Sequence, residues 1–64
     1  MIVKEVLIDD EASTLWRVTD DQIEWFEVKC GIHKLMRFET FEDAKAHYER
    51  WAPEAYKDWL TFDD

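Results

Sequence analysis

Leu15-Trp-Arg-Val-Thr-Asp-Asp-Gln-Ile-Glu-Trp-Phe-Glu-Val28 has the composition of two β-strands joined by a tight turn. Its tryptophan, valine, isoleucine and phenylalanine residues suit a pleated, half-buried surface, and aspartate tolerates the backbone geometry of a turn. If Asp20 and Asp21 form the loop, Arg17 faces Glu24 across the hairpin and two tryptophans become neighbours. Both pairings are favourable, at about 0.2–1 kcal/mol each, so we predict a hairpin in this register.

Two further strands and a helix flank this hairpin. The predicted strands cover about residues 2–8, 14–19, 22–29 and 32–38, and the predicted helix covers about residues 41–51 and 53–61. Thr40 can cap the helix, with Asp43 placed to form a weak capping box, whereas Pro53 removes one helical hydrogen bond. The sequence therefore predicts a single α+β domain over residues 1–64. It is a four-stranded antiparallel β-meander (order 1-2-3-4) with a C-terminal helix, kinked or broken near Pro53, packed on one face.

Charge pairing extends the predicted register to the outer strands. Opposite charges on neighbouring strands align into one row, which is Glu5, Arg17, Glu24 and Arg37. The only glycine, Gly31, follows Cys30 at a point where a two-residue turn before the last strand needs a positive φ angle. Because cysteine is a poor first residue in such a turn, a wider loop with the same register is the alternative.

The predicted register divides the sheet into two faces. The face expected beneath the helix carries Val6, Ile8, Trp16, Val18, Ile23, Trp25, Met36 and Phe38. The opposite face carries the charge row and an apolar band made of Leu7, Leu15, Phe26, Val28 and Leu35. Since no residues remain to cover this band, and exposed apolar patches mark interaction sites, we expect the band to bind a protein. The alternative is a different register that buries these residues.

Length, charge and cysteine content argue against several classes of function. The chain has 64 residues and a formal net charge of −8, from sixteen acidic and eight basic residues. Direct binding to nucleic acid or to anionic membranes is disfavoured, because both need a basic surface. No run of about 18 apolar residues is present that would predict a membrane span. The single cysteine cannot form an intramolecular disulfide, which favours a reducing, cytoplasmic location.

Acidic residues are predicted to gather at one end of the sheet. In a four-stranded meander the second loop and the exit of the last strand share an end, which would hold Asp20, Asp21, Glu39, Glu42 and Asp43. Spaced carboxylates on a rigid scaffold can imitate a phosphate backbone, by analogy with small acidic inhibitors of nucleic-acid-binding proteins. The alternative is that turns and helix starts simply favour aspartate and glutamate. Interspersed lysines and arginines also weaken the mimicry.

Few residues are candidates for chemistry. Cys30 and His33 have a Cys-x-x-His spacing, but no second pair follows, and His47 is expected on the side of the helix away from the sheet. A zinc site needs three or four ligands, and a nucleophilic thiol needs a base and surroundings that stabilise the thiolate. Carboxylate pairs arise by chance in so acidic a chain. We therefore predict no enzyme activity, no metal and no cofactor.

These features together favour a non-catalytic protein–protein interaction module. Its predicted docking residues are the apolar band and the acidic sheet end. The expected partner is another protein, basic or nucleic-acid-binding, and the concrete version is a small acidic inhibitor of the phage anti-defence or DNA-mimic type. The alternative is a homodimeric structural or accessory protein whose copies contact each other through the outer sheet face.

Overall fold

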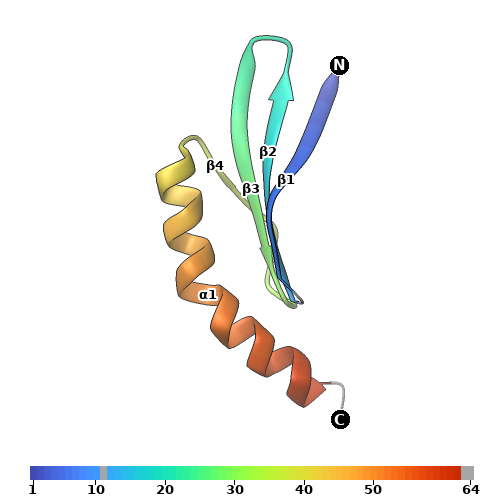
Figure 1. Cartoon of the computed structure of the whole chain (residues 1–64), viewed down its shortest axis with the longest axis vertical. Helices are drawn as coiled ribbons and strands as arrows, with labels where there is room; N and C mark the ends of the chain where they lie inside the picture. Colours follow the sequence, from blue (N-terminus) through green and yellow to red (C-terminus); the bar gives the residue numbers. More distant parts are fainter. Residues whose placement is uncertain (11, 63–64) are drawn as a thin grey trace.

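The computed structural model describes residues 1–10 and 12–62, with side chains described up to residue 54. Its elements are β1 (Ile2–Asp10), β2 (Ser13–Asp20), β3 (Ile23–Cys30), β4 (Met36–Phe38) and α1 (Phe41–Phe62). The four strands form one antiparallel sheet in the order β1-β2-β3-β4, and α1 lies on one side of it (Figure 1). The predicted α+β fold, a meander with a C-terminal helix packed on one face, is confirmed.

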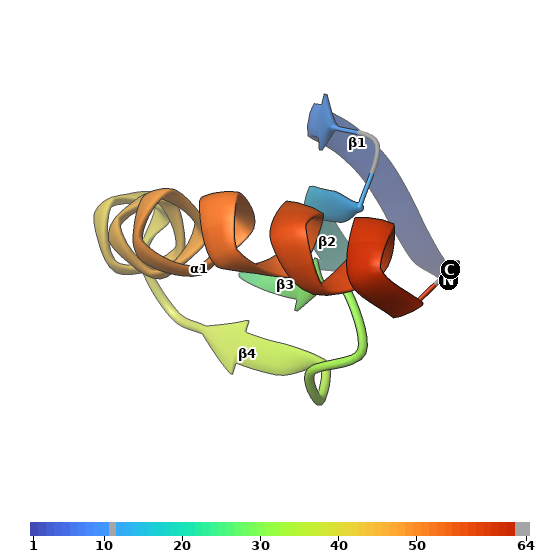
Figure 2. The same cartoon turned by 90° about the horizontal axis from the view of Figure 1, so that it is seen from below.

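The helix begins with the predicted cap and continues through Pro53. The Thr40 hydroxyl oxygen accepts a hydrogen bond from the backbone N–H of Asp43 at 3.3 Å, which satisfies one of the free donors of the first turn. α1 is one uninterrupted element, and its axis bends about halfway along, where the sequence places Pro53 (Figure 1). Figures 1 and 2 show that the second half of α1 passes below the lower end of the sheet.

The β2–β3 turn contains Asp21 and Gln22 rather than the predicted Asp20 and Asp21. Asp20 pairs with Ile23 at the end of the ladder, and Asp21 has a φ angle of 58°. The favoured two-residue hairpin turns need a positive φ at the first loop position, and aspartate adopts it more readily than most residues. The change moves every pair of this hairpin by two residues. The two tryptophans are no longer directly opposite each other, but they stay on the same face.

β1 pairs with β2 in the predicted register over its first half, where Glu5 faces Arg17. A β-bulge then adds one residue to β1, so Leu15 faces Ile8 instead of the predicted Leu7. Leu7 is half-buried and packs against the core. The bulge was not predicted, because the sequence around it contains no glycine and no break in the apolar run.

The last strand is shorter than predicted and pairs in a different register. β4 has three residues, and Arg37 faces Glu27 instead of the predicted Glu24. The connection before it, residues 31–35, starts at Gly31 with a φ angle of 56°, so the expected positive φ is present in a wider loop. The shift by an odd number of residues places Arg37 on the opposite side of the sheet from the rest of the predicted charge row.

The helix packs on the sheet face that was predicted to be exposed. The buried core consists of Leu15, Phe26, Val28 and Cys30 from the sheet and Ala44, Tyr48 and Ala52 from the helix. The prediction of an exposed apolar band is therefore wrong for Leu15, Phe26 and Val28. Leu7 lies at the margin of the core, and Leu35, in the connection before β4, is 44% exposed.

Small helix side chains explain why this face is covered. The buried residues Ala44 and Ala52 lie one turn on either side of Tyr48, so α1 can approach the sheet closely. A close approach suits aliphatic side chains such as Leu15 and Val28, whereas tryptophans would hold the helix away and would need a partner for their N–H groups. Of the residues predicted beneath the helix, Ile8 and Phe38 do pack against the core, and Met36, paired with Val28, lies on the same side but is 40% exposed. Val6, Trp16, Val18, Ile23 and Trp25 lie on the other face.

Leu15→Ala and Leu35→Ala separate the buried part of the predicted band from the exposed part. Leu15 is fully buried, so we expect Leu15→Ala to lower the free energy of unfolding by about 2–5 kcal/mol. Leu35 is 44% exposed, and Leu35→Ala should cost less than about 1 kcal/mol. Urea denaturation of the two variants measures the difference. Equal losses would contradict the packing of α1 over Leu15.

The positive φ angle of Asp21 provides a test of the turn. Asp21→Gly should be at least as stable as the wild type, because glycine adopts positive φ without a steric cost. Asp21→Val should lose about 1–2 kcal/mol, because a β-branched side chain is strained there. Asp21→Asn controls for the lost charge. Thermal unfolding followed by circular dichroism compares the three variants, and equal stability of the valine and glycine variants would place the turn elsewhere.

Candidate functional site

One side of the sheet is left without a helix. Directly paired residues of a sheet lie on the same face, which places Trp16, Glu27 and Arg37 together on the side opposite α1. We call this side the outward face, and it consists of Ile2, Lys4, Val6, Asp9, Thr14, Trp16, Val18, Asp20, Ile23, Trp25, Glu27, Lys29 and Arg37. It is drawn from all four strands of the sheet.

Trp16 and Trp25 shield Val18 on the outward face from water. Val18 is only 1% exposed, although α1 lies on the other side of the sheet. The Nζ atom of Lys4 lies 4.4 Å from the ring centroid of Trp16, and the guanidinium carbon of Arg37 lies 4.1 Å from a ring centroid of Trp25. Such cation–π contacts contribute about 0.5–1 kcal/mol at exposed sites. Each half-buried ring is therefore covered by a basic side chain.

Glu27 connects the two cation–aromatic pairs. One carboxylate oxygen accepts a hydrogen bond from Trp25 Nε1 at 3.0 Å, and the other lies 2.8 Å from Lys4 Nζ. Burial alone would raise the pKa of Glu27, but the hydrogen bonds from Lys4 and Trp25, together with nearby positive charge, outweigh burial and lower the pKa. The carboxylate is therefore ionised at neutral pH and fixes the arrangement of the outward face.

Three aliphatic side chains on the outward face are exposed to water. Ile2 and Ile23 are each 61% exposed, and Val6 is 54% exposed. Both isoleucines pair with Asp20, so they flank β2 on the same side. Exposed apolar groups beside tryptophan and arginine are typical of protein-binding surfaces. Val6 and Ile23 were predicted to lie beneath the helix, and Ile2 was assigned to neither face.

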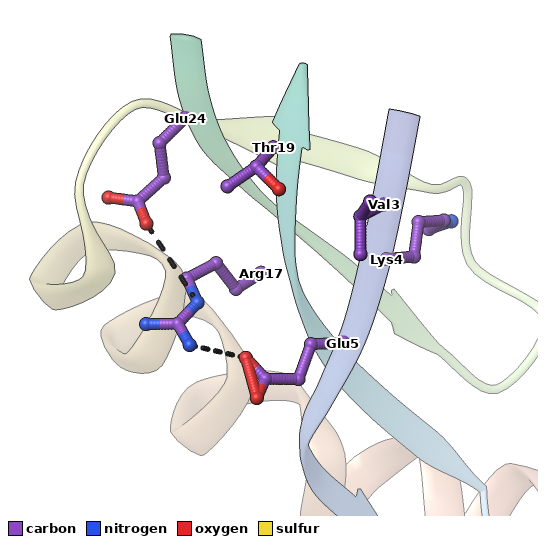
Figure 3. A pocket seen from close by; sticks show the side chains of 6 residues that line it. All are labelled: Val3, Lys4, Glu5, Arg17, Thr19 and Glu24. Carbon is purple, nitrogen blue, oxygen red and sulfur yellow. Dashed lines mark hydrogen bonds and ion pairs between the residues drawn. The ribbon is translucent and has the colours of Figure 1, made fainter. Parts of the chain in front are cut away.

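A charged groove lies on the helix side of the sheet. Its volume is about 500 Å³, and it is lined by Val3, Glu5, Arg17, Thr19 and Glu24 on this side and by Lys4, whose side chain extends to the outward face. Figure 3 shows the Arg17 guanidinium between two carboxylates: it pairs with Glu5, and its Nε lies 3.8 Å from Glu24 Oε1. Three members of the predicted charge row therefore do come together. All three are about half exposed, so the pairs contribute about 0–1 kcal/mol each, and the single positive charge of Arg17 offsets one of the two negative charges.

The acidic residues predicted to cluster lie in two separate places. Asp20 and Asp21 are at the tip of the β2–β3 hairpin, where the α-amino nitrogen of Met1 lies 3.4 Å and 3.6 Å from their carboxylates. The exposed acidic residues at the start of α1 are Glu39, Glu42 and Asp43. β4 ends opposite Phe26, and the hairpin continues roughly 15 Å beyond that point (Figure 1). The predicted single acidic cluster is therefore not formed.

Cys30 is not placed for chemistry. Its side chain is buried in the core, and burial raises the pKa of its thiol. A buried thiol of this kind reacts slowly, because the thiolate is the nucleophile. In the part of the chain that the structure describes, no group of three or more histidine, cysteine, aspartate or glutamate residues is arranged to hold a metal ion.

The two histidines both lie near Trp51 of the helix, an arrangement that the sequence did not predict. His47 was expected on the side of α1 away from the sheet, but its ring centroid lies 5.1 Å from that of Phe38 in β4. The rings of His33 and His47 lie 5.4 Å and 6.3 Å from that of Trp51. Helical spacing predicts that His47 and Trp51 are neighbours. The position of His33 depends on the path of the β3–β4 connection, for which the sequence contains no comparable signal.

The chain matches no known protein family, and no curated protein or solved structure resembles it. Among the residues described, no helix has both the length and the apolar content needed to cross a bilayer.

Glu27→Gln should lower the free energy of unfolding at neutral pH. It should also make this free energy depend less on pH in the acidic range. A carboxylate with a lower pKa in the folded state stabilises the fold above its unfolded pKa, 4.5 here, and this contribution is lost as the pH falls through the folded pKa. Urea unfolding from neutral pH to about pH 3 should show a gap between wild type and variant that closes as the pH falls. The exposed Glu24→Gln serves as the control. A gap that is constant across this range would show that the charge of Glu27 does not stabilise the outward face.

Proposed function

We propose that this protein is a non-catalytic protein–protein interaction module that docks its partner through the outward face. The observation that supports the proposal is the group of exposed aliphatic side chains, Ile2, Val6 and Ile23, beside Trp16 and Trp25. Tryptophan in such settings supplies a large share of interface energy. The cations and the carboxylate around the rings hold them in place before binding, which reduces the entropy cost of docking.

The net charge favours a partner with a basic surface. A chain of net charge −8 attracts positively charged proteins at long range, and nucleic-acid-binding proteins have such surfaces. A small acidic inhibitor of such a protein, of the phage anti-defence or DNA-mimic type, is the concrete version of the proposal. Asp20 and Asp21 at the hairpin tip, and the acidic start of α1, would steer the approach while the outward face makes the contact.

A homodimer through the outward face is the second candidate. Its exposed isoleucine and valine side chains can pack against the same residues of a second copy related by a two-fold axis. Against this, two copies repel each other through their equal net charges. Light scattering of the wild-type protein over a range of concentrations distinguishes a monomer from a dimer.

Ile23→Asp and Ile32→Asp form a matched pair that tests the outward face. The two isoleucines are 61% and 69% exposed, but Ile32 lies in the β3–β4 connection, outside the outward face. The wild type and each variant are attached to beads, and the beads are incubated with a cell extract at low and at high salt. The proteins that each kind of bead retains are then compared. We expect the wild type and Ile32→Asp to retain one partner protein at low salt, and Ile23→Asp to lose it. High salt should release this partner from the beads.

Two outcomes would contradict the proposal. Retention of the same proteins by the wild type and by Ile23→Asp would remove the outward face as the contact surface. A wild-type dimer that Ile23→Asp converts into a folded monomer, with no retained partner, would establish self-association in its place. Thermal unfolding of both variants shows whether each is folded.

A further inference from the structure

A second pocket lies between the β3–β4 connection and the helix. Its volume is about 230 Å³, and it is lined by His33, Lys34, Met36, His47 and Trp51. The connection supplies the first two residues, β4 supplies the methionine, and α1 supplies the last two. The pocket therefore depends on the same three segments that bring the two histidines together.

The side chains that line this pocket are basic or uncharged, whereas the protein as a whole is acidic. None of the described residues lining it carries a carboxylate, in a chain with sixteen acidic residues. Lys34 is cationic, and both histidines can take up a proton. Neither Arg50, whose guanidinium carbon lies 5.2 Å from the ring centroid of Trp51, nor Asp43, one helical turn before His47, is among the lining residues. The pocket therefore favours an anion.

The rest of the pocket lining is aromatic and apolar. Trp51 is half-buried, and the ring of His33 tilts against it at a centroid distance of 5.4 Å. Met36 adds a polarisable, 40% exposed side chain. A cavity of about 150 Å³ is enough to hold benzene, so about 230 Å³ leaves room for one aromatic ring and a small anionic group.

We propose that this pocket binds a ligand made of one aromatic ring that carries a phosphate group. The ring packs against Trp51 and Met36, and the phosphate oxygens accept hydrogen bonds from Lys34 and the protonated histidines. The binding site is separate from the outward face and does not depend on the interaction proposed there.

Proton uptake should accompany binding. Burial, and then the positive charge of His33, lower the pKa of His47 in the free protein. A bound phosphate offsets both effects, so the pKa of His47 should rise on binding. By linkage, binding should tighten as the pH falls through the raised pKa of His47 in the complex toward its lower pKa in the free protein, by up to roughly tenfold for each unit of the rise. The second proton of the phosphate, with a pKa of about 6, limits this trend at low pH, because the monoanion binds more weakly.

Phenyl phosphate is the probe, and nuclear magnetic resonance is the readout. The chain has only two histidines, so their ring proton signals report on both sides of the pocket. We expect a dissociation constant of about 1 mM, which is what a ligand of this size reaches. Phenol and inorganic phosphate should each bind at least about tenfold more weakly, because each lacks one half of the ligand. Equal binding of inorganic phosphate would overturn the proposal by revealing a non-specific anion site.

A matched pair of lysine variants locates the binding. Lys34→Gln should weaken phenyl phosphate binding about two- to fivefold, the effect of one exposed charge pair, whereas Lys45→Gln, on the same helix as His47 but outside the pocket, should leave it unchanged. Ile23→Asp should also leave it unchanged. Equal effects of the two lysine variants, or histidine signals that phenyl phosphate does not move, would contradict the proposal.

Comparing phenyl phosphate with a peptide distinguishes a free aryl phosphate from a phosphorylated peptide as the ligand. A short phosphotyrosine peptide contains the same aryl phosphate group. Binding as tight as that of phenyl phosphate would indicate a site for a free aryl phosphate, and tighter binding would indicate a phosphorylated peptide. Both results support the pocket, whereas peptide binding that survives Lys34→Gln unchanged would overturn it.

Discussion

A single helix can cover only one face of a four-stranded sheet, and most of this structure follows from which face it covers. Ala44 and Ala52, on either side of Tyr48, allow α1 to lie close to the sheet. The aliphatic residues Leu15 and Val28 fill the space beneath it. A chain of this length has a small core, and buried apolar area is the main source of its stability. The other face must therefore be protected by side chains of the sheet itself.

The outward face is protected by tryptophans and cations instead of a second layer. Trp16 and Trp25 bury Val18, and each ring is covered in turn by a basic side chain. This arrangement uses the amphipathic character of lysine and arginine, whose apolar stems pack on a ring while the charge stays in water. The protection ends at the margins, where isoleucine and valine side chains remain exposed. The same face is thus partly a small core and partly a surface available for contact.

Local signals in the sequence predicted the elements, whereas the assignment of faces needed information that is not local. The strand order, the Thr40 cap and the Glu5–Arg17 pair depend on short-range chemistry, and all of them are present. Both faces of β2 and β3 carry apolar residues together with charged ones, so alternation could not show which one lies beneath the helix. Pairing charges also favoured a register in which Arg37 met Glu24. The wider connection after Gly31 shifts β4 by an odd number of residues, which reverses its faces. The proximity of the two histidines depends on that same connection, so the predicted register could not have shown it.

The outward face and the protein as a whole have different electrostatic characters, and this difference restricts the kind of partner that fits. At a distance a partner experiences the net charge of −8. At contact it meets Lys4 and Arg37 over the tryptophan rings, with Glu27 already paired to Lys4, and Asp20 between the two exposed isoleucines. A uniformly basic surface, shaped to grip a phosphate backbone, would be attracted from afar and then meet like charges at short range. In the interaction we propose, contact through the outward face would add apolar complementarity to Ile23 and the tryptophans to the long-range attraction that the acidic hairpin tip and helix start supply.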